Sequence, residues 1–210
     1  MKKYLLYLMT AVAILSFGAC SKDHNSEPNQ PGIENPDDSK DDDNNTPGNL
    51  DGKTLVAYFS WGGTTQRMAQ EIAEQTGADI FRIEPATPYP TDYTQTTEVA
   101  RAEKDNNARP AIKSKIDNWA QYDTIFIGCP VWWWTTPMII CTFAESYDFD
   151  GKIVIPFCTY ASTYRDETLA RIVELTSDAK HLQGLGLTSA NVNKTNINNW
   201  LKQIGLVDQY

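Results

Sequence analysis

The stretch that decides the fold is Leu55–Thr65, LVAYFSWGGTT, which runs directly into the segment QRMAQEIAEQTG. The apolar run 55–59 is rich in strand formers and predicts a short buried strand. The two glycines and three hydroxyl-bearing residues of 60–65 then precede an apolar pattern with a 3.6-residue period, which predicts a turn leading into a helix. Backbone N–H groups are free at such a helix start and favour a phosphate site.

The amino-acid sequence of this turn excludes two better-known phosphate-binding loops. It contains neither the Gly-Lys-Ser/Thr of nucleoside triphosphatases nor the G-x-G-x-x-G of dinucleotide-binding proteins. A plain strand-to-helix turn, which uses glycine for its geometry and threonine as the helix cap, is the alternative interpretation.

Strand-like and helix-like segments alternate along the rest of the chain. The predicted strands cover 53–59, 79–84, 123–129, 152–158 and 181–187, and the predicted helices cover 65–76, 94–107, 136–147, 166–175 and 194–204. Such alternation is typical of an α/β fold with an open, doubly wound parallel sheet. Ligands of these sheets bind at the carboxyl ends of the strands.

The N-terminal fifty residues have a different composition from the predicted domain at 51–210. Residues 1–19 resemble a lipoprotein signal peptide, because two lysines and an apolar run precede Gly18-Ala19-Cys20. Cys20 is then the predicted lipidation site, with an uncleaved anchor or plain secretion as the alternatives. The segment 20–50 carries eight acidic residues and no aromatic residue, which predicts a disordered tether. The protein is therefore expected in the bacterial cell envelope, attached to the membrane through Cys20.

Charge and cysteine content exclude several classes of function. The net charge of −9 argues against nucleic acid as a partner. The chain has two histidines and no C-x-x-C, so no metal site is expected. Cys129 and Cys158 both end predicted strands, and an export compartment permits a disulfide between them. Buried free thiols at Cys129, Cys141 and Cys158 are the favoured interpretation.

Aromatic residues follow two of the predicted strands. The third strand leads into PVWWWTTP (130–137) and the fourth into CTYASTYRDE (158–167). Three consecutive tryptophans cannot all point into one core, so at least one is expected to face a cleft or solvent, unless they plug the end of the sheet. A phosphate turn and two aromatic loops at one edge suit a flat, phosphorylated heterocycle.

The motifs YFSWGGTT, PVWWWTTP and IPFCTY, with RIEPATPYPTDY between them, resemble those of the flavodoxin family. The resemblance is greatest to a bacterial, lipoprotein-like branch with the signatures Y-F-S-W-S-G-N-T, P-x-W-W-G and I-P-F-C-T, and it covers residues 54–207. It implies a five-stranded sheet of order 2-1-3-4-5, in the short-chain form, and a bound flavin mononucleotide (FMN).

The resemblance also implies which residues hold the cofactor. The phosphate would be held by Ser60, Gly62, Gly63, Thr64 and Thr65. The flavin ring would be lined by the second loop, Val131, Trp132, Trp133, Trp134 and Thr135, with Trp132 or Trp133 stacked on it. Thr159 and Tyr160 would approach the ring from the other side. The chain departs from the branch at Gly62, where serine is usual, at Trp134, where glycine is usual, and in the third loop, YASTYRDE, where glycines are common.

These features predict an exported, lipid-anchored carrier that passes electrons between a reductase and an acceptor. The acceptor is a redox partner protein or a small molecule, and a two-electron FMN-dependent oxidoreductase is a variant of this prediction. No residue spacing indicates a catalytic acid, base or nucleophile. The alternative is a flavodoxin-shaped surface binding module that has lost FMN.

The second loop carries one further expectation. In the family, a peptide of this loop turns into the positive-φ region when the flavin is reduced by one electron, and glycine allows that turn. The loop Val131–Thr135 contains no glycine. We therefore expect its bulky residues to resist positive φ and electrons to move in pairs.

Overall fold

The structure is a computed structural model that describes residues 52–208. The predicted signal peptide and tether, including Cys20, lie outside the described residues. The strands are β1 (Lys53–Tyr58), β2 (Asp79–Arg82), β3 (Tyr122–Pro130), β4 (Ile153–Tyr160), β5 (Lys180–His181) and β6 (Leu185–Thr188). The helices are α1 (Thr64–Thr76), α2 (Tyr93–Asp105), α3 (Met138–Ala144), α4 (Arg165–Leu175) and α5 (Lys194–Gln203), with short 3-10 helices at Trp119–Gln121 and Ser189–Asn191.

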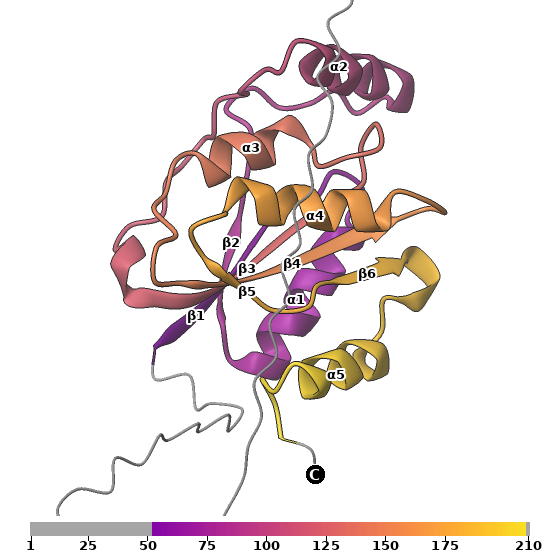
Figure 1. The fold of residues 1–210 in the computed structure, drawn as a ribbon. Coiled ribbons are helices and arrows are strands. Elements are labelled where there is room, and N and C mark those ends of the chain that lie inside the picture. The colour runs from indigo at the N-terminus through magenta and orange to yellow at the C-terminus, as the bar shows by residue number, and fades with distance from the viewer. Residues whose placement is uncertain (1–51, 209–210) are drawn as a thin grey trace, which may run out of the picture. The chain divides into compact units, whose positions relative to one another are not determined.

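The strands form one parallel sheet of order β2-β1-β3-β4-β5, in which β6 also pairs with β4 (Figure 1). Neighbouring strands run parallel throughout, as buried strands separated by helices require. The predicted sheet order 2-1-3-4-5 is therefore confirmed, with the fifth position shared by two short strands.

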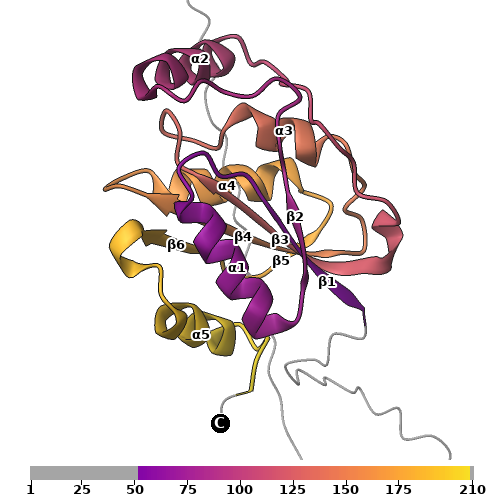
Figure 2. The same ribbon diagram turned by 180° about the vertical axis from the view of Figure 1, so that it is seen from behind.

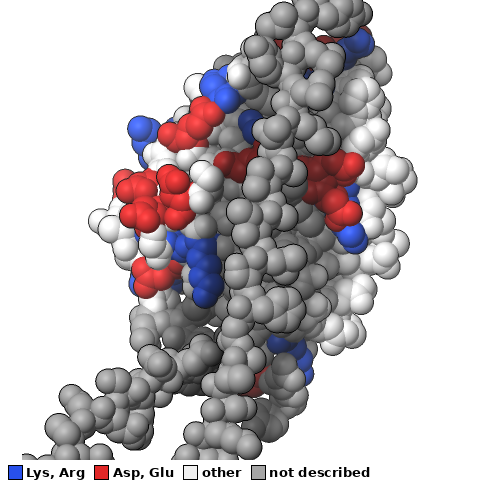
Figure 3. Space-filling model, in the orientation of Figure 1, with Lys and Arg blue, Asp and Glu red and all other residues white. Residues whose placement is uncertain are grey.

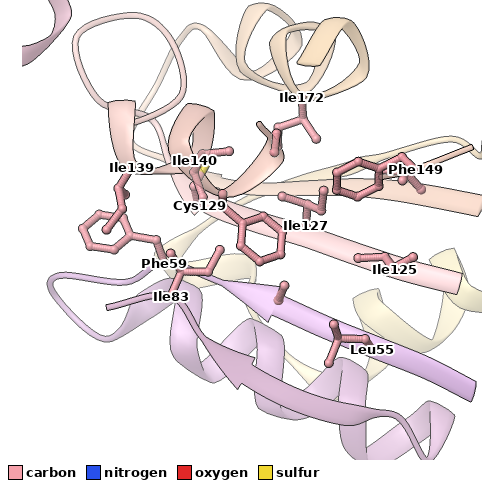
Figure 4. Packing of buried hydrophobic residues seen from close by; sticks show 14 of the residues in the cluster. Leu55, Phe59, Ile83, Ile125, Ile127, Cys129, Ile139, Ile140, Phe149 and Ile172 are labelled. Carbon is pink, nitrogen blue, oxygen red and sulfur yellow. The ribbon is translucent and has the colours of Figure 1, made fainter. Parts of the chain in front are cut away.

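Side chains of successive strand residues alternate between two cores, one on each face of the sheet. Leu55 and Ala57 belong to a cluster completed by α3 and α4, and Figure 4 shows its packing. Val56 and Tyr58 belong to the opposite cluster, which α1 and α5 complete. Figures 1 and 2 show these two helix layers on either side of the sheet.

The sequence pattern predicts one strand over 181–187 at the fifth position of the sheet. In the structure this strand is interrupted beside Pro156 of β4. The register joins Val154 to His181 and Phe157 to Leu185, so three residues of the edge segment face two residues of β4. Proline has no N–H to donate to the neighbouring strand, and a break or bulge is the usual consequence. The edge therefore splits into β5 and β6.

Helix α3 is shorter than the predicted span 136–147. It begins at Met138, because Pro137 is the N-cap with extended backbone (φ −56°, ψ 144°), and it ends at Ala144. A residue before proline is also driven toward extended conformations, which removes Thr136 from the helix.

The three cysteines of the described domain are free and buried. Cys129 and Cys158 are register partners on β3 and β4, yet they form no disulfide. The interpretation of these residues as buried thiols is confirmed. Within residues 52–208, no helix is long and apolar enough to cross a membrane.

The connections after β1, β3 and β4 meet at one edge, because these three strands are neighbours in the sheet. Helix α2 lies in the long connection from β2 to β3, beside α3 and away from the sheet (Figures 1 and 2). Figure 3 shows acidic side chains in more than one group on this face of the molecule. Asp166 and Glu167 occupy the first turn of helix α4.

Candidate functional site

The first loop joins β1 to α1 and exposes the start of that helix. Gly63 is the N-cap at φ 84°, and its N–H donates to Ser60 Oγ at 3.2 Å. The first turn of α1 contains no acidic residue. A Cβ built on Gly62 or Gly63 would meet no atom within 4 Å, so open space adjoins the loop. Helix-start N–H groups that face open space form a site suited to an anion.

Two buried hydroxyls adjoin this loop, that of Thr65 in the first turn of α1 and that of Thr159 near the end of β4. Thr65 Oγ1 and Thr159 Oγ1 are 2.7 Å apart, and the two residues are 1% and 6% exposed. One hydroxyl donates to the other, so one hydroxyl hydrogen of the pair has no acceptor among the described residues. Buried polar hydrogens usually have a partner. The leftover hydrogen fits a negatively charged group held by the loop above it.

The second loop is a two-residue turn made entirely of tryptophan at its centre. Trp132 and Thr135 exchange both backbone hydrogen bonds, at 3.0 and 3.1 Å. Trp133 and Trp134 between them have φ values of 45° and 72°. Positive φ at both central residues defines a type I′ turn, which normally selects Asn-Gly. The expectation that bulky residues keep this loop out of the positive-φ region is therefore wrong.

This finding removes the basis for the expected transfer of electrons in pairs. The left-handed region costs an ordinary residue on the order of 1–2 kcal/mol. The loop already adopts that conformation at two positions, so contacts elsewhere must compensate for the strain.

The three tryptophans have three different surroundings. Trp132 packs edge to face against Phe59 and Tyr89, with ring centroids 5.1 Å away in both cases. The indole N–H of Trp133 donates to the carbonyl oxygen of Thr97 at 2.8 Å. Trp134 is 56% exposed, which confirms that at least one of the three faces a cleft or solvent.

The third loop follows β4 and ends at the start of α4. Tyr164 is the N-cap of α4 at φ 63°, and its ring lies 5.9 Å from that of Trp134. Tyr160 is half-buried at the end of β4, opposite Thr188 of β6. Thr159 accepts the N–H of Val131 on its carbonyl oxygen at 2.9 Å, which ties the second loop to the third.

These loops and α2 enclose a cleft of about 390 Å³. Four of its lining side chains are aromatic and at least one-third exposed: Trp61, Tyr93, Trp134 and Tyr164. Of the predicted ring-binding residues, Val131, Trp132, Trp133 and Trp134 line the cleft, whereas Thr135, Thr159 and Tyr160 do not. Whether Trp132 or Trp133 stacks on a flavin stays a prediction.

Sequence reasoning missed the contribution of α2. Tyr93, Thr96, Thr97 and Ala100 of this helix line the cleft, as do Trp61 and the third-loop residues 161–164. The exposed aromatic residues Trp61 and Tyr93 were the signal that could have indicated them. Placing α2 over the cleft required the tertiary structure, because the connection from β2 to β3 is long and its length does not show which loops the helix contacts.

The site offers neither a metal centre nor a reactive thiol. The described residues contain no group of three or more His, Cys, Asp or Glu that could hold a metal ion. Burial raises the pKa of the Cys158 thiol to about 12 and that of Cys129 well above its usual value. Both thiols are therefore protonated and unreactive at neutral pH.

The strained turn gives a prediction about stability. We expect the free energy of unfolding of Trp134→Gly to be about 1 kcal/mol higher than that of Trp134→Ala, because alanine is strained at φ 72° and glycine is not. Urea denaturation measures the difference. At Thr163, an exposed third-loop residue outside the positive-φ set, the glycine variant should have no such advantage over the alanine variant. Equal stability of the two Trp134 variants would contradict the strained turn.

Comparison with known proteins agrees with this geometry. A family model described as flavodoxin matches residues 53–204. A protein of Bacteroides uniformis designated a flavoprotein is 37% identical, over 72% of this chain and 98% of its own, with a TM-score of 0.66. A similar protein of Bacteroides eggerthii is 34% identical, over 73% of this chain and 98% of its own, with a TM-score of 0.65.

A more distant structure shares the fold. The flavoprotein of Lactobacillus acidophilus in complex with FMN is 24% identical, over 71% of this chain and 98% of its own, with a TM-score of 0.60. No curated protein matches the chain. The family model matches most of the chain, and this chain covers nearly the whole length of the two Bacteroides proteins. The chain belongs to the flavodoxin family.

Proposed function

We propose that this protein binds FMN at the cleft and carries electrons between a reductase and an acceptor. The phosphate would be held by the N–H groups at the start of α1, with Ser60 and Gly63 shaping the loop. The ring would lie in the cleft between the second loop, the third loop and α2. Bound FMN would supply the redox chemistry, while the protein supplies binding, orientation and electrostatics.

One observation carries this proposal. An anion cradle with an unmatched buried hydroxyl hydrogen and a cleft with four exposed aromatic rings lie at the same edge of the sheet. Trp61 belongs to the first loop and also lines the cleft, so the two parts are continuous. A phosphorylated molecule with a flat ring satisfies both parts at once. The FMN complex of the Lactobacillus acidophilus flavoprotein, which shares the fold, supports this choice.

Fluorescence titration with FMN and riboflavin tests the proposal. We expect the flavin fluorescence to be quenched on binding, with FMN bound more tightly than riboflavin, which lacks the phosphate. Failure of both flavins to bind would favour the alternative of a binding module without a cofactor. A steady-state assay with a reduced nicotinamide then separates a two-electron oxidoreductase, which turns over alone, from a carrier that needs a reductase.

We also propose that the protein is exported and anchored to the membrane by a lipid on Cys20. The support is the sequence Gly18-Ala19-Cys20 after a basic start and an apolar run. Replacing Cys20 with serine should release the protein into the soluble fraction, because no acceptor for the lipid remains. Fractionation and an immunoblot measure this release. Membrane retention of Cys20→Ser at full precursor length would contradict lipid anchoring and favour an uncleaved anchor.

A further inference from the structure

The strained turn Trp133–Trp134 has contacts to one element in particular, helix α2. The carbonyl oxygen of Thr97 accepts the indole N–H of Trp133 at 2.8 Å. The guanidinium of Arg101, one helical turn further along, lies 5.4 Å from the centroid of the Trp133 ring. Lys104 places its ammonium 5.9 Å from the centroid of the Trp134 ring. Both cations lie within the range at which the face of an indole attracts a positive charge.

The same helix is fixed to the base of the second loop by a separate chain of contacts. Tyr89 donates its hydroxyl hydrogen to Glu103 Oε2 of α2 at 2.8 Å. The Tyr89 ring packs edge to face on Trp132, with centroids 5.1 Å apart. Thr96 of α2 donates to the carbonyl oxygen of Pro90 at 2.6 Å, and the same oxygen accepts the indole N–H of Trp61 at 2.9 Å. Helix α2 is therefore linked to the second loop through Tyr89 and to the first loop through Pro90.

Two further observations indicate that α2 acts on the turn from outside it. Within residues 52–208, the backbone of the turn itself makes two hydrogen bonds, both between Trp132 and Thr135, while two of its residues are at positive φ. Asp105 lies between the two cations, 3.5 Å from Arg101 and 2.8 Å from Lys104, and this pairing favours side-chain positions near the indoles.

We infer that helix α2 holds the Trp133–Trp134 turn in its strained conformation, and that Arg101 and Lys104 are positioning residues for the flavin ring. The part of this inference that concerns flavin rests on the proposed function. Loss of the two cations frees the indoles, and the turn then relaxes away from the conformation that shapes the cleft. The phosphate cradle, at the start of α1, is unaffected by that change.

The first test measures the turn itself, in the full chain without flavin. Nuclear magnetic resonance follows exchange of the Trp133 indole N–H with solvent, and the signal is assigned with Trp133→Phe. Loss of each cation–indole contact should raise the exchange rate of this N–H roughly two- to five-fold. The double variant Arg101→Gln, Lys104→Gln should therefore exchange about ten-fold faster than the unaltered protein. Lys115→Gln, which removes an exposed cation far along the chain from the turn, is the control for loss of a surface charge and should leave exchange unchanged.

Conservative substitution separates positioning from general loss of structure. Arg101→Lys keeps the positive charge over the indole, so it should restore most of the protection that Arg101→Gln removes. Exchange in the double variant no faster than in Lys115→Gln would overturn the inference. Failure of Arg101→Lys to restore protection would overturn it as well, because the cation would then not be the cause.

The second test measures flavin affinity. The double variant should bind riboflavin and FMN with affinities lowered by the same factor, about ten-fold. Both flavins carry the ring that the second loop contacts, and the phosphate cradle is intact. A loss confined to FMN would overturn the positioning role. If the unaltered protein binds neither flavin, the proposed function fails, while indole exchange still decides whether α2 holds the turn.

Discussion

Replacing Gly128 with alanine is expected to lower the free energy of unfolding by at least about 2 kcal/mol. Gly128 lies on β3, directly opposite Phe157 of β4 in the register. A Cβ at this position would overlap the Phe157 ring, which is fully buried. Since residues of the same core cluster, such as Phe126 and Ile155, are also fully buried, the ring has no space into which it could move. In an unhindered strand the same substitution would be favourable, because alanine has less backbone entropy to lose.

Two variants make this prediction specific, and urea denaturation measures all of them. Gly62→Ala should change stability by no more than about 0.5 kcal/mol, since its Cβ meets no atom within 4 Å. Phe157→Leu, which shortens the side chain that would be overlapped, should recover part of the loss when combined with Gly128→Ala. A Gly128→Ala protein as stable as the unaltered protein would show that the ring does not cover this glycine.

The effect reaches the site as well as the core. Phe59, the residue before Ser60, donates its N–H to the carbonyl oxygen of Gly128 at 2.9 Å. This bond fixes the point at which the first loop leaves the sheet. Gly128→Ala is therefore expected to weaken flavin binding together with stability.

Most of the fold could be predicted because local patterns and the tertiary structure agree. Apolar strands and amphipathic helices alternate, and every predicted element is present within a few residues of its predicted bounds. The errors have physical causes that lie outside such patterns. Pro156 breaks the neighbouring strand rather than its own, and Pro137 caps α3 instead of occupying its first turn.

The site was less predictable than the sheet. Gly63 was identified because glycine at a turn is a local signal, and it does occupy the positive-φ position. The arrangement of Trp132, Trp133 and Trp134 was not, since an identical run of residues gives no indication of which ring is buried. Their turn contradicts local preference and depends on contacts from α2, which are 30 or more residues distant in sequence.

The buried hydroxyl pair gives the second large effect. Replacing Thr65 with valine, which keeps the branched shape but removes the hydroxyl, should weaken FMN by about ten-fold or more. A hydrogen bond to a charged group contributes roughly 1.5–3 kcal/mol, and with Thr159 donating to Thr65 the hydrogen available for the phosphate is that of the Thr65 hydroxyl. Riboflavin has no phosphate, so its affinity should hardly change. Thr65→Ser, which retains the hydroxyl, should bind FMN nearly as well as the unaltered protein.

Stability provides an independent test of the same pair, without flavin. Thr65→Val leaves the Thr159 hydroxyl, 6% exposed, without its partner, which costs about 1–3 kcal/mol of unfolding free energy. The double variant Thr65→Val, Thr159→Val removes both groups and should be less destabilised than the sum of the single variants. Equal losses of FMN and riboflavin affinity in Thr65→Val would contradict the phosphate assignment. Additive stability losses would contradict the hydrogen bond itself, because two hydroxyls that do not interact give no coupling energy.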